Sequence, residues 1–167
     1  MSIQLLLILL ACTEATTEAP APAPAAEPAP QVDPAEEMKA AYDAVEGDAR
    51  RDWLMAQGKT VYMKGGHGGI ACNTCHNEDG KGTKGAFPPL VGQKEHMGDC
   101  AQTTGNVING LTGEMVVDGV TYNGVMIPQG ELLNDYEIAA VATYVRNSWG
   151  NDYGDCTPED VAKARGK

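Results

Sequence analysis

Aromatic side chains are scarce in this 167-residue chain, which contains one Phe, two Trp and six Tyr, or 5% of its residues. The chain also has 20 Gly and 10 Pro, so few of the bulky groups that usually fill a protein core are present. Its length allows one compact domain with tails and disfavours a multidomain enzyme. We therefore expect a single domain whose core is filled in part by something other than side chains.

Basic residues are also few, since 12 Lys and Arg stand against 23 Asp and Glu and give a formal net charge of -11. This charge repels phosphate backbones, and we expect no nucleic-acid partner. Long apolar runs are missing as well, because no stretch reaches the roughly 20 residues that cross a bilayer. Any attachment to a membrane is therefore expected to be an anchor.

The first apolar run, from Leu5 to Ala11, is short and is followed by Cys12. It predicts a signal peptide over residues 1–11. The string Leu9-Leu10-Ala11-Cys12 resembles a bacterial lipobox, in which the leader is cleaved before a cysteine that then carries lipid chains. This resemblance implies export and lipidation of Cys12. No Lys or Arg precedes Lys39, and a soluble exported protein cleaved at another site is the alternative.

Residues 12–37 consist mainly of Ala, Pro, Thr and Glu, and contain no aromatic residue. Such a composition buries too little apolar surface to fold. Alternating Ala and Pro favour extended polyproline II at about 3.1 Å per residue. We expect these residues to form a disordered tether between the lipid anchor and a folded domain over residues 38–167.

Helical periodicity and capping residues predict four helices in the folded part. They begin at Asp33, at about Ala49, at Asn134 and at Thr157, and the first three end before Gly47, near Lys64 and near Gly150. Between residues 65 and 130 the chain is rich in Gly, Asn, Thr and Pro, which predicts loops wrapped around a bound group. The one strand prediction there is a hairpin over residues 115–122 with Asp118-Gly119 at its turn.

The string Cys72-Asn73-Thr74-Cys75-His76 has the spacing of a c-type haem attachment site. Two thiols separated by two residues can reach the two vinyl groups of one porphyrin and form thioethers, and the adjacent imidazole then serves as an axial ligand of the iron. A thioredoxin-like redox pair would need a βαβ setting, which the pattern does not show. Zinc would need further ligands, and Cys100, Cys156, His67 and His96 contain no second closely spaced pair.

With this motif the chain resembles the class I c-type cytochromes, over residues 49–150 and more weakly to residue 165. The other matching features are Gly58 and Tyr62, the stretches 87–90 and 122–126, and residues 135–151, DYEIAAVATYVRNSWGN. The last stretch is similar to the closing helix of cytochrome domains associated with terminal oxidases and periplasmic dehydrogenases. The resemblance implies an all-α haem domain with long loops, in which Gly58 and Tyr62 meet Tyr144 where the terminal helices cross.

The resemblance also implies that Met126 is the sixth ligand of the iron. In this family the methionine is usually followed directly by Pro, whereas here Ile127 precedes Pro128. The competing ligands are His67, His96, Met97 and Met115. A thioether ligand raises the reduction potential relative to two imidazoles, and a six-coordinate iron leaves no position for a substrate. This ligation favours an electron carrier over an enzyme.

Cys100 and Cys156 are the remaining cysteines of the domain. In an oxidising compartment we expect them to form a disulfide, with two unpaired thiols as the alternative. A bond closing this loop is worth about 4 kcal/mol in the chain-entropy model.

Together these features predict a single-electron carrier with one covalent haem c. It is expected in a periplasmic or cell-surface respiratory chain, as a free shuttle or as the cytochrome subunit of a larger redox complex. Its expected partners are redox donors and acceptors such as a membrane-bound oxidase, reductase or dehydrogenase. Three alternatives stay open: a haem enzyme with an open sixth site for peroxide or nitrite, a gas or redox sensor, and a zinc-stabilised structural domain.

Overall fold

Helices dominate residues 32–166, the part of the chain that the structure, a computed structural model, describes. The helices are α1 (Pro34–Asp43), α2 (Gly47–Lys64), α3 (Asn73–His76), α4 (Lys94–Met97), α5 (Cys100–Asn109), α6 (Asp135–Arg146) and α7 (Pro158–Ala164). The expected helical fold class is thereby confirmed. The expected signal peptide, Cys12 and most of the expected tether lie outside the described residues. Helix α1 begins at Pro34, so residues 34–37, expected to belong to the tether, are helical.

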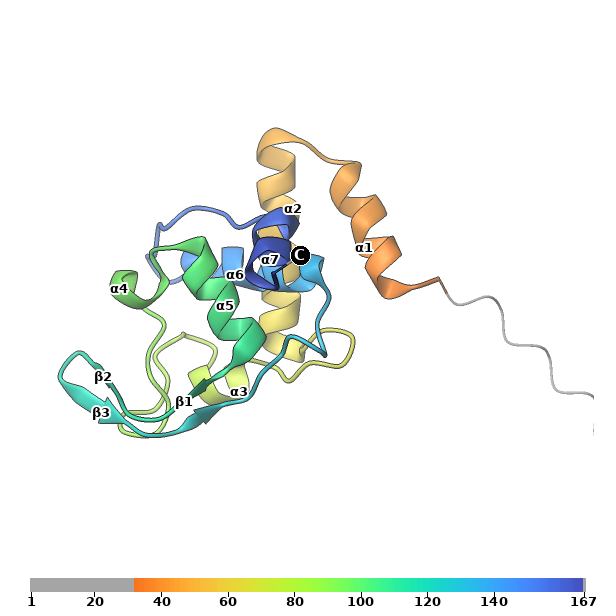
Figure 1. Cartoon of the computed structure of the whole chain (residues 1–167). Helices are drawn as coiled ribbons and strands as arrows, with labels where there is room; N and C mark the ends of the chain where they lie inside the picture. Colours follow the sequence, from red (N-terminus) through yellow and green to blue (C-terminus); the bar gives the residue numbers. More distant parts are fainter. Residues whose placement is uncertain (1–31, 167) are drawn as a thin grey trace, which may run out of the picture. The chain divides into compact units, whose positions relative to one another are not determined.

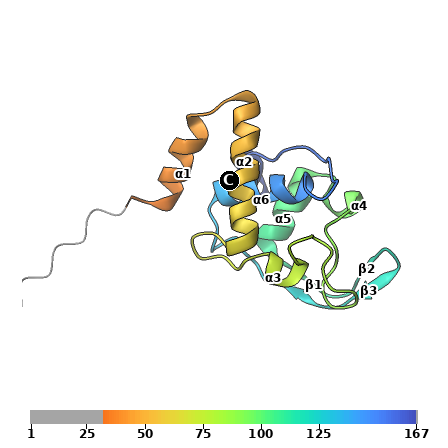
Figure 2. The same cartoon turned by 180° about the vertical axis from the view of Figure 1, so that it is seen from behind.

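The longest helix, α2, packs against α6 and forms the centre of the fold (Figures 1 and 2). Their close approach depends on Gly58, where an added Cβ would lie 2.1 Å from the carbonyl oxygen of Ala140 and 2.6 Å from Cβ of Tyr144. One turn later, the fully buried Tyr62 packs against Tyr144 with ring centroids 5.4 Å apart. The expected contact of Gly58 and Tyr62 with Tyr144 is confirmed.

Helix α6 begins where the sequence predicts and ends earlier. The Asn134 side chain accepts a hydrogen bond from the backbone N–H of Glu137, and the Glu137 carboxylate accepts one from that of Asn134, so the capping box is present. The expected end near Gly150 is wrong, because α6 stops at Arg146. Beyond it the side-chain amide of Asn147 donates to the Gly154 carbonyl oxygen at 3.1 Å, and this contact holds the returning chain against the helix end.

Two aromatic clusters join the helices. Tyr42 at the end of α1 packs edge-on against Trp53 of α2 and Tyr136 of α6, with ring centroids 5.7 and 5.6 Å away. Trp149, just past α6, has a positive φ of 56° and contacts the rings of Tyr62 and Tyr144 at 5.2 and 5.6 Å. Both tryptophans therefore serve in packing, although Trp149 lies outside the helix that the periodicity predicted for it.

Helix α5 was not predicted, since residues 65–130 were expected to form loops and one hairpin. Asp99 caps α5 by accepting a hydrogen bond from the backbone N–H of Ala101 at 2.8 Å. At its first residue, Cys100 forms a disulfide with Cys156, and their Cα atoms lie 5.7 Å apart. The disulfide connects α5 to the segment that precedes α7.

Four short strands accompany the helices, as two antiparallel pairs. They are β1 (Leu111–Thr112), paired with β4 (Val125–Met126), and β2 (Met115–Val117), paired with β3 (Val120–Tyr122). The β2–β3 hairpin is the one predicted, and both turn residues have positive φ, 49° at Asp118 and 73° at Gly119. Positive φ at both central positions is typical of the type I′ turn that an Asp-Gly pair favours.

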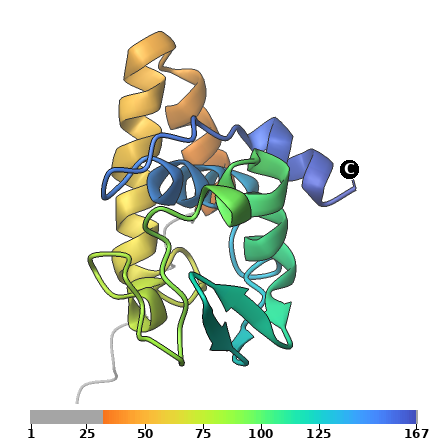
Figure 3. The same ribbon diagram turned by 90° about the vertical axis from the view of Figure 1, so that its left-hand side faces the viewer.

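The hairpin and α3 lie at the same end of the domain, and α1 lies away from them (Figures 1 and 3). None of the helices in residues 32–166 is long and apolar enough to cross a membrane.

Candidate haem site

The cysteine–histidine motif forms a single helical turn. Cys72 is the N-cap of α3, and the backbone N–H groups of Cys75 and His76 both donate to its carbonyl oxygen, at 3.2 and 3.0 Å. Residues three and four positions apart lie on one face of a helix. The turn therefore presents both thiols and the imidazole on one side, and all three line the same cavity.

This cavity has a volume of about 420 Å³, within the usual range for cofactor pockets. Its wall comes from α3, the segment 86–90, α4, α5, the short strands and α6. Apolar side chains predominate in it, among them Leu90, Met97, Val107, Val117, Val141 and Val145. An apolar cavity with two thiols and one imidazole in its wall fits a covalently attached haem. It also accounts for the shortage of bulky core residues in the sequence.

A hydrogen bond fixes the ring of His76. Its Nδ1 lies 3.0 Å from the carbonyl oxygen of Pro88, to which a neutral imidazole donates its proton. Burial lowers the pKa of His76, although the Pro88 carbonyl acts in the opposite direction. The neutral form is therefore favoured, and Nε2 is left as the nitrogen that can bind a metal. This arrangement is what an axial ligand requires.

The two thiols do not resemble a redox pair. Neither is paired with another cysteine of residues 32–166, and burial raises the pKa of Cys72 to about 11. Catalytic Cys-X-X-Cys pairs instead have lowered thiol pKa values, because the thiolate is the reactive form. Within the same residues no group of three or more His, Cys, Asp or Glu side chains is placed to hold a metal ion.

The structure brings most candidates for the sixth ligand to the cavity wall. Met126 lines the cavity from β4, where the backbone pairs with Leu111 of β1. His96, Met97 and Met115 line it too. His67 does not, since its Nδ1 lies 2.8 Å from Oε1 of Glu137 and its side chain is half exposed. Of the four competitors, His67 is thus the one that the structure places away from the cavity.

The glycine-rich stretch 65–69, which precedes the motif, is hydrogen-bonded to α6. The buried carboxylate of Glu137 accepts a hydrogen bond from the backbone N–H of His67 at 2.8 Å. An added Cβ at Gly66 would lie 2.2 Å from Oε1 of Glu137, so glycine is needed for this approach. The next residues are held by Gln129, whose Oε1 accepts from the backbone N–H of Ile70 at 2.9 Å.

The segment after the motif is also held by side-chain amides. The buried Asn151 donates to the carbonyl oxygen of Leu90 at 3.0 Å and accepts from the backbone N–H of Gly92 at 2.8 Å. Gln129, Asn151 and the Pro88 carbonyl were not identified from the sequence as parts of the site. For these three groups the sequence offered one local signal, the Pro88-Pro89 pair with its family resemblance. Gln129 and Asn151 lie 59 residues from the backbone N–H groups that they accept from, those of Ile70 and Gly92.

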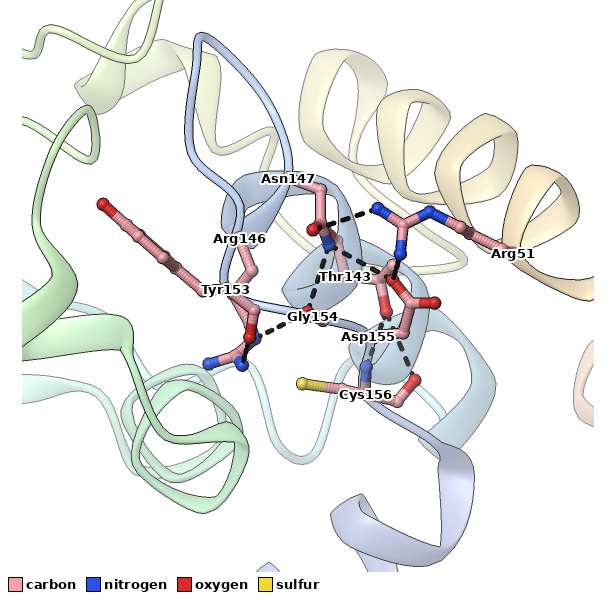
Figure 4. A network of polar contacts seen from close by, with 8 residues as sticks. All are labelled: Arg51, Thr143, Arg146, Asn147, Tyr153, Gly154, Asp155 and Cys156. Carbon is pink, nitrogen blue, oxygen red and sulfur yellow. Dashed lines mark hydrogen bonds and ion pairs between the residues drawn. The ribbon is translucent and has the colours of Figure 1, made fainter. Parts of the chain in front are cut away.

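Arg146 is buried beside the cavity without entering it. Its guanidinium donates to the backbone carbonyl oxygens of Met97, Tyr153 and Gly154, and the last two contacts are drawn in Figure 4. Burial lowers the pKa of this group. All three contacts hold backbone segments together, so Arg146 has a structural role.

Comparisons with known proteins agree with this site. The family model described as Cytochrome c matches residues 55–149. Cytochrome c-552 of Thermus thermophilus is 36% identical over 124 residues, which cover 67% of this chain and 86% of that protein. The cytochrome c subunit of the quinone alcohol dehydrogenase of Gluconacetobacter polyoxogenes is 31% identical over 115 residues, 67% of this chain and 24% of that subunit. That of Gluconobacter oxydans is 31% identical over 118 residues, 65% of this chain and 24% of the subunit. The chain thus belongs to the cytochrome c family, whose members bind haem c covalently and transfer electrons.

Proposed function

We propose that this cytochrome carries single electrons between membrane-bound redox proteins, with haem attached at Cys72 and Cys75 and with His76 and Met126 as the axial ligands. When bound, the haem supplies an iron that alternates between ferric and ferrous states. The observation that carries the proposal is the hydrogen bond from Nδ1 of His76 to Pro88, next to two unpaired thiols in an apolar cavity.

The residues that line the cavity contribute to this function in different ways. The thiols form the thioether links, and the Pro88 carbonyl orients the His76 ring and increases its donor strength. The apolar side chains would exclude water from a bound haem and so keep its surroundings nearly the same in the two oxidation states. Pairing between β4 and β1 holds the backbone of Met126 at the cavity wall.

Absorption spectra of the haem-loaded protein test the ligand pair. We expect the ferric wild type to show the weak far-red band of methionine ligation and Met126→Ala to lack it. Met115→Ala and Met97→Ala, which change other methionines of the wall, should retain the band. Loss of the band in one of these two variants and not in Met126→Ala would assign the sixth ligand to that residue instead. A wild type without the band would favour His96 or an open site.

We further propose that the protein is exported and anchored through lipid on Cys12, with residues 13–33 as a tether. A tether raises the effective concentration of the domain near membrane-bound partners. The similarity to the cytochrome subunits of quinone alcohol dehydrogenases supports a partner of the dehydrogenase type, although this chain spans about a quarter of each subunit. Membrane fractionation tests the anchor, because Cys12→Ser should move the protein from the membrane to the soluble fraction. A wild type found in the soluble fraction would contradict it.

A further inference from the structure

We infer that Asn151 is a positioning residue for the axial imidazole, acting through the Pro88 carbonyl. The inference rests on the proposed function, in which His76 binds the iron. Asn151 follows α6, lies 6% exposed and makes three side-chain hydrogen bonds. One of them, to the Val145 carbonyl oxygen at 2.8 Å, fastens the side chain to the end of α6. The other two hold the segment that follows the haem motif.

Those two bonds end close to the acceptor of His76. The Asn151 amide donates to Leu90 at 3.0 Å and accepts from the backbone N–H of Gly92 at 2.8 Å. The Leu90 N–H in turn donates to the carbonyl oxygen of Gly80 at 2.7 Å. Leu90 is therefore held on both its N–H and its carbonyl, two residues after Pro88.

The residues between Leu90 and the acceptor are stiff. Pro88 and Pro89 each have a fixed φ and lack a backbone N–H, so neither can donate a backbone hydrogen bond. The Pro88 carbonyl lies between two anchors. On one side Phe87 is paired with Thr83 through two backbone hydrogen bonds of 2.8 Å, and on the other side Asn151 supports Leu90. Because this carbonyl accepts from Nδ1 of His76 at 3.0 Å, a looser anchor at Leu90 weakens the hold on the imidazole from that side.

Asn147 supplies a matched control. It is also an asparagine beyond the end of α6, and its amide donates to the carbonyl oxygens of Thr143 at 2.8 Å and Gly154 at 3.1 Å (Figure 4). Its Oδ1 accepts from Arg51 at 3.2 Å. These bonds hold the segment before Cys156 and none reaches residues 88–92, so Asn147→Ala removes comparable bonds from the same helix end.

The test is hydrogen exchange in the reduced, haem-loaded protein, followed by nuclear magnetic resonance. The rates for the His76 Nδ1 proton and the Leu90 amide are each divided by that of the buried Val141 amide, which corrects for any change in global stability. In Asn151→Ala we expect both ratios to rise about tenfold, as loss of a buried hydrogen bond implies. In Asn147→Ala both ratios should stay near the wild-type value. Asn151→Ser, which can keep one of the bonds, should fall between the wild type and Asn151→Ala.

Equal ratios in the two alanine variants would overturn the inference and leave the haem ligation intact. If Asn151→Ala does not fold, the comparison is made with Asn151→Ser, where an unchanged ratio would have the same meaning. The wild-type spectrum separately tests the proposed function. A wild type in which the His76 ring proton and His-ligated haem bands are both missing would overturn the ligation, and the inference with it.

Discussion

Two regions of this cytochrome are stabilised in different ways. We define the helical half as α1, α2, α6 and α7. Direct packing between helices stabilises it, for example where Gly58 of α2 lies against Ala140 of α6. The cavity half, residues 65–130, forms most of the wall around about 420 Å³ of space, which α6 completes with Val141 and Val145. Side-chain amides such as those of Gln93, Gln129 and Asn151 hold its loops. The helical half thus has a core of its own, whereas the cavity half needs the haem to complete one.

The largest effect should come from leaving out the haem. At about 24 cal/mol per Å³, an unfilled cavity of 420 Å³ corresponds to at most ~10 kcal/mol, comparable with the whole stability of a domain. Protein produced without haem maturation should therefore lose hydrogen-exchange protection throughout the cavity half while keeping part of the helix signal in far-ultraviolet circular dichroism. Identical melting temperatures for the haem-free and haem-loaded proteins would contradict the difference between the two halves.

Removing the disulfide, which joins the two halves, should have the next largest effect. Replacing Cys100 and Cys156 together by Ser should lower the free energy of unfolding by about 4 kcal/mol, because a sequence separation of 56 residues is released in the unfolded chain. Urea unfolding of the haem-loaded protein measures this loss. As a control, a thiol reductant should destabilise the wild type and leave the double variant unchanged, since thioethers resist reduction. No effect of the reductant on the wild type would argue against the bond.

Close packing in the helical half can be tested with two glycines that both lie in helices. An added Cβ at Gly58 would meet Ala140 and Tyr144 at 2.6 Å or less, whereas at Gly105 of α5 nothing lies within 4 Å. Gly58→Ala should lower the free energy of unfolding by about 1–3 kcal/mol through overpacking. Gly105→Ala should raise it by about 0.5–1 kcal/mol, because alanine is the better helix former. Thermal unfolding distinguishes the signs, and a stabilising Gly58→Ala would mean that the helices are further apart than described.

The same contrast between the halves explains what the sequence could predict. Helices α1, α6 and α7 begin with local signals, such as the Asn134–Glu137 capping box and the Thr157 cap before Pro158. The hairpin was predictable too, because the Asp118-Gly119 pair favours the turn by its own conformational preference and needs no contact with distant residues. These elements depend on residues that are near one another in the chain.

Helix α5 shows where local signals are not sufficient. Its sequence, CAQTTGNVIN, is rich in residues that favour helices weakly, and the Thr104 hydroxyl donates to the Cys100 carbonyl. Contacts with α6 and α7 and the disulfide to Cys156 stabilise it, and none of these is visible locally.

The site divides in the same way. The thiols and the imidazole come from one five-residue motif and were predicted directly. The partner of His76 and the support of that partner come from distant segments, since Asn151 is 59 residues from Gly92 and 61 from Leu90. Met126 stays a prediction, because three of its competitors also line the cavity.

The smallest expected effects compare one helix cap from each half. Asn134→Ala removes the cap of α6, and Asp99→Ala removes the cap of α5, so each should cost about 1 kcal/mol. The distribution of the loss should differ. Because α6 packs against α2, α5 and α7, Asn134→Ala should lower the global free energy of unfolding and speed exchange at amides in all of them. Asp99→Ala should speed exchange mainly within α5, whose end Cys100 keeps attached to Cys156. If Asp99→Ala instead lowered hydrogen-exchange protection in α2 and α6 as much as in α5, the two halves would unfold as one unit. Their different packing would then produce no difference in local stability.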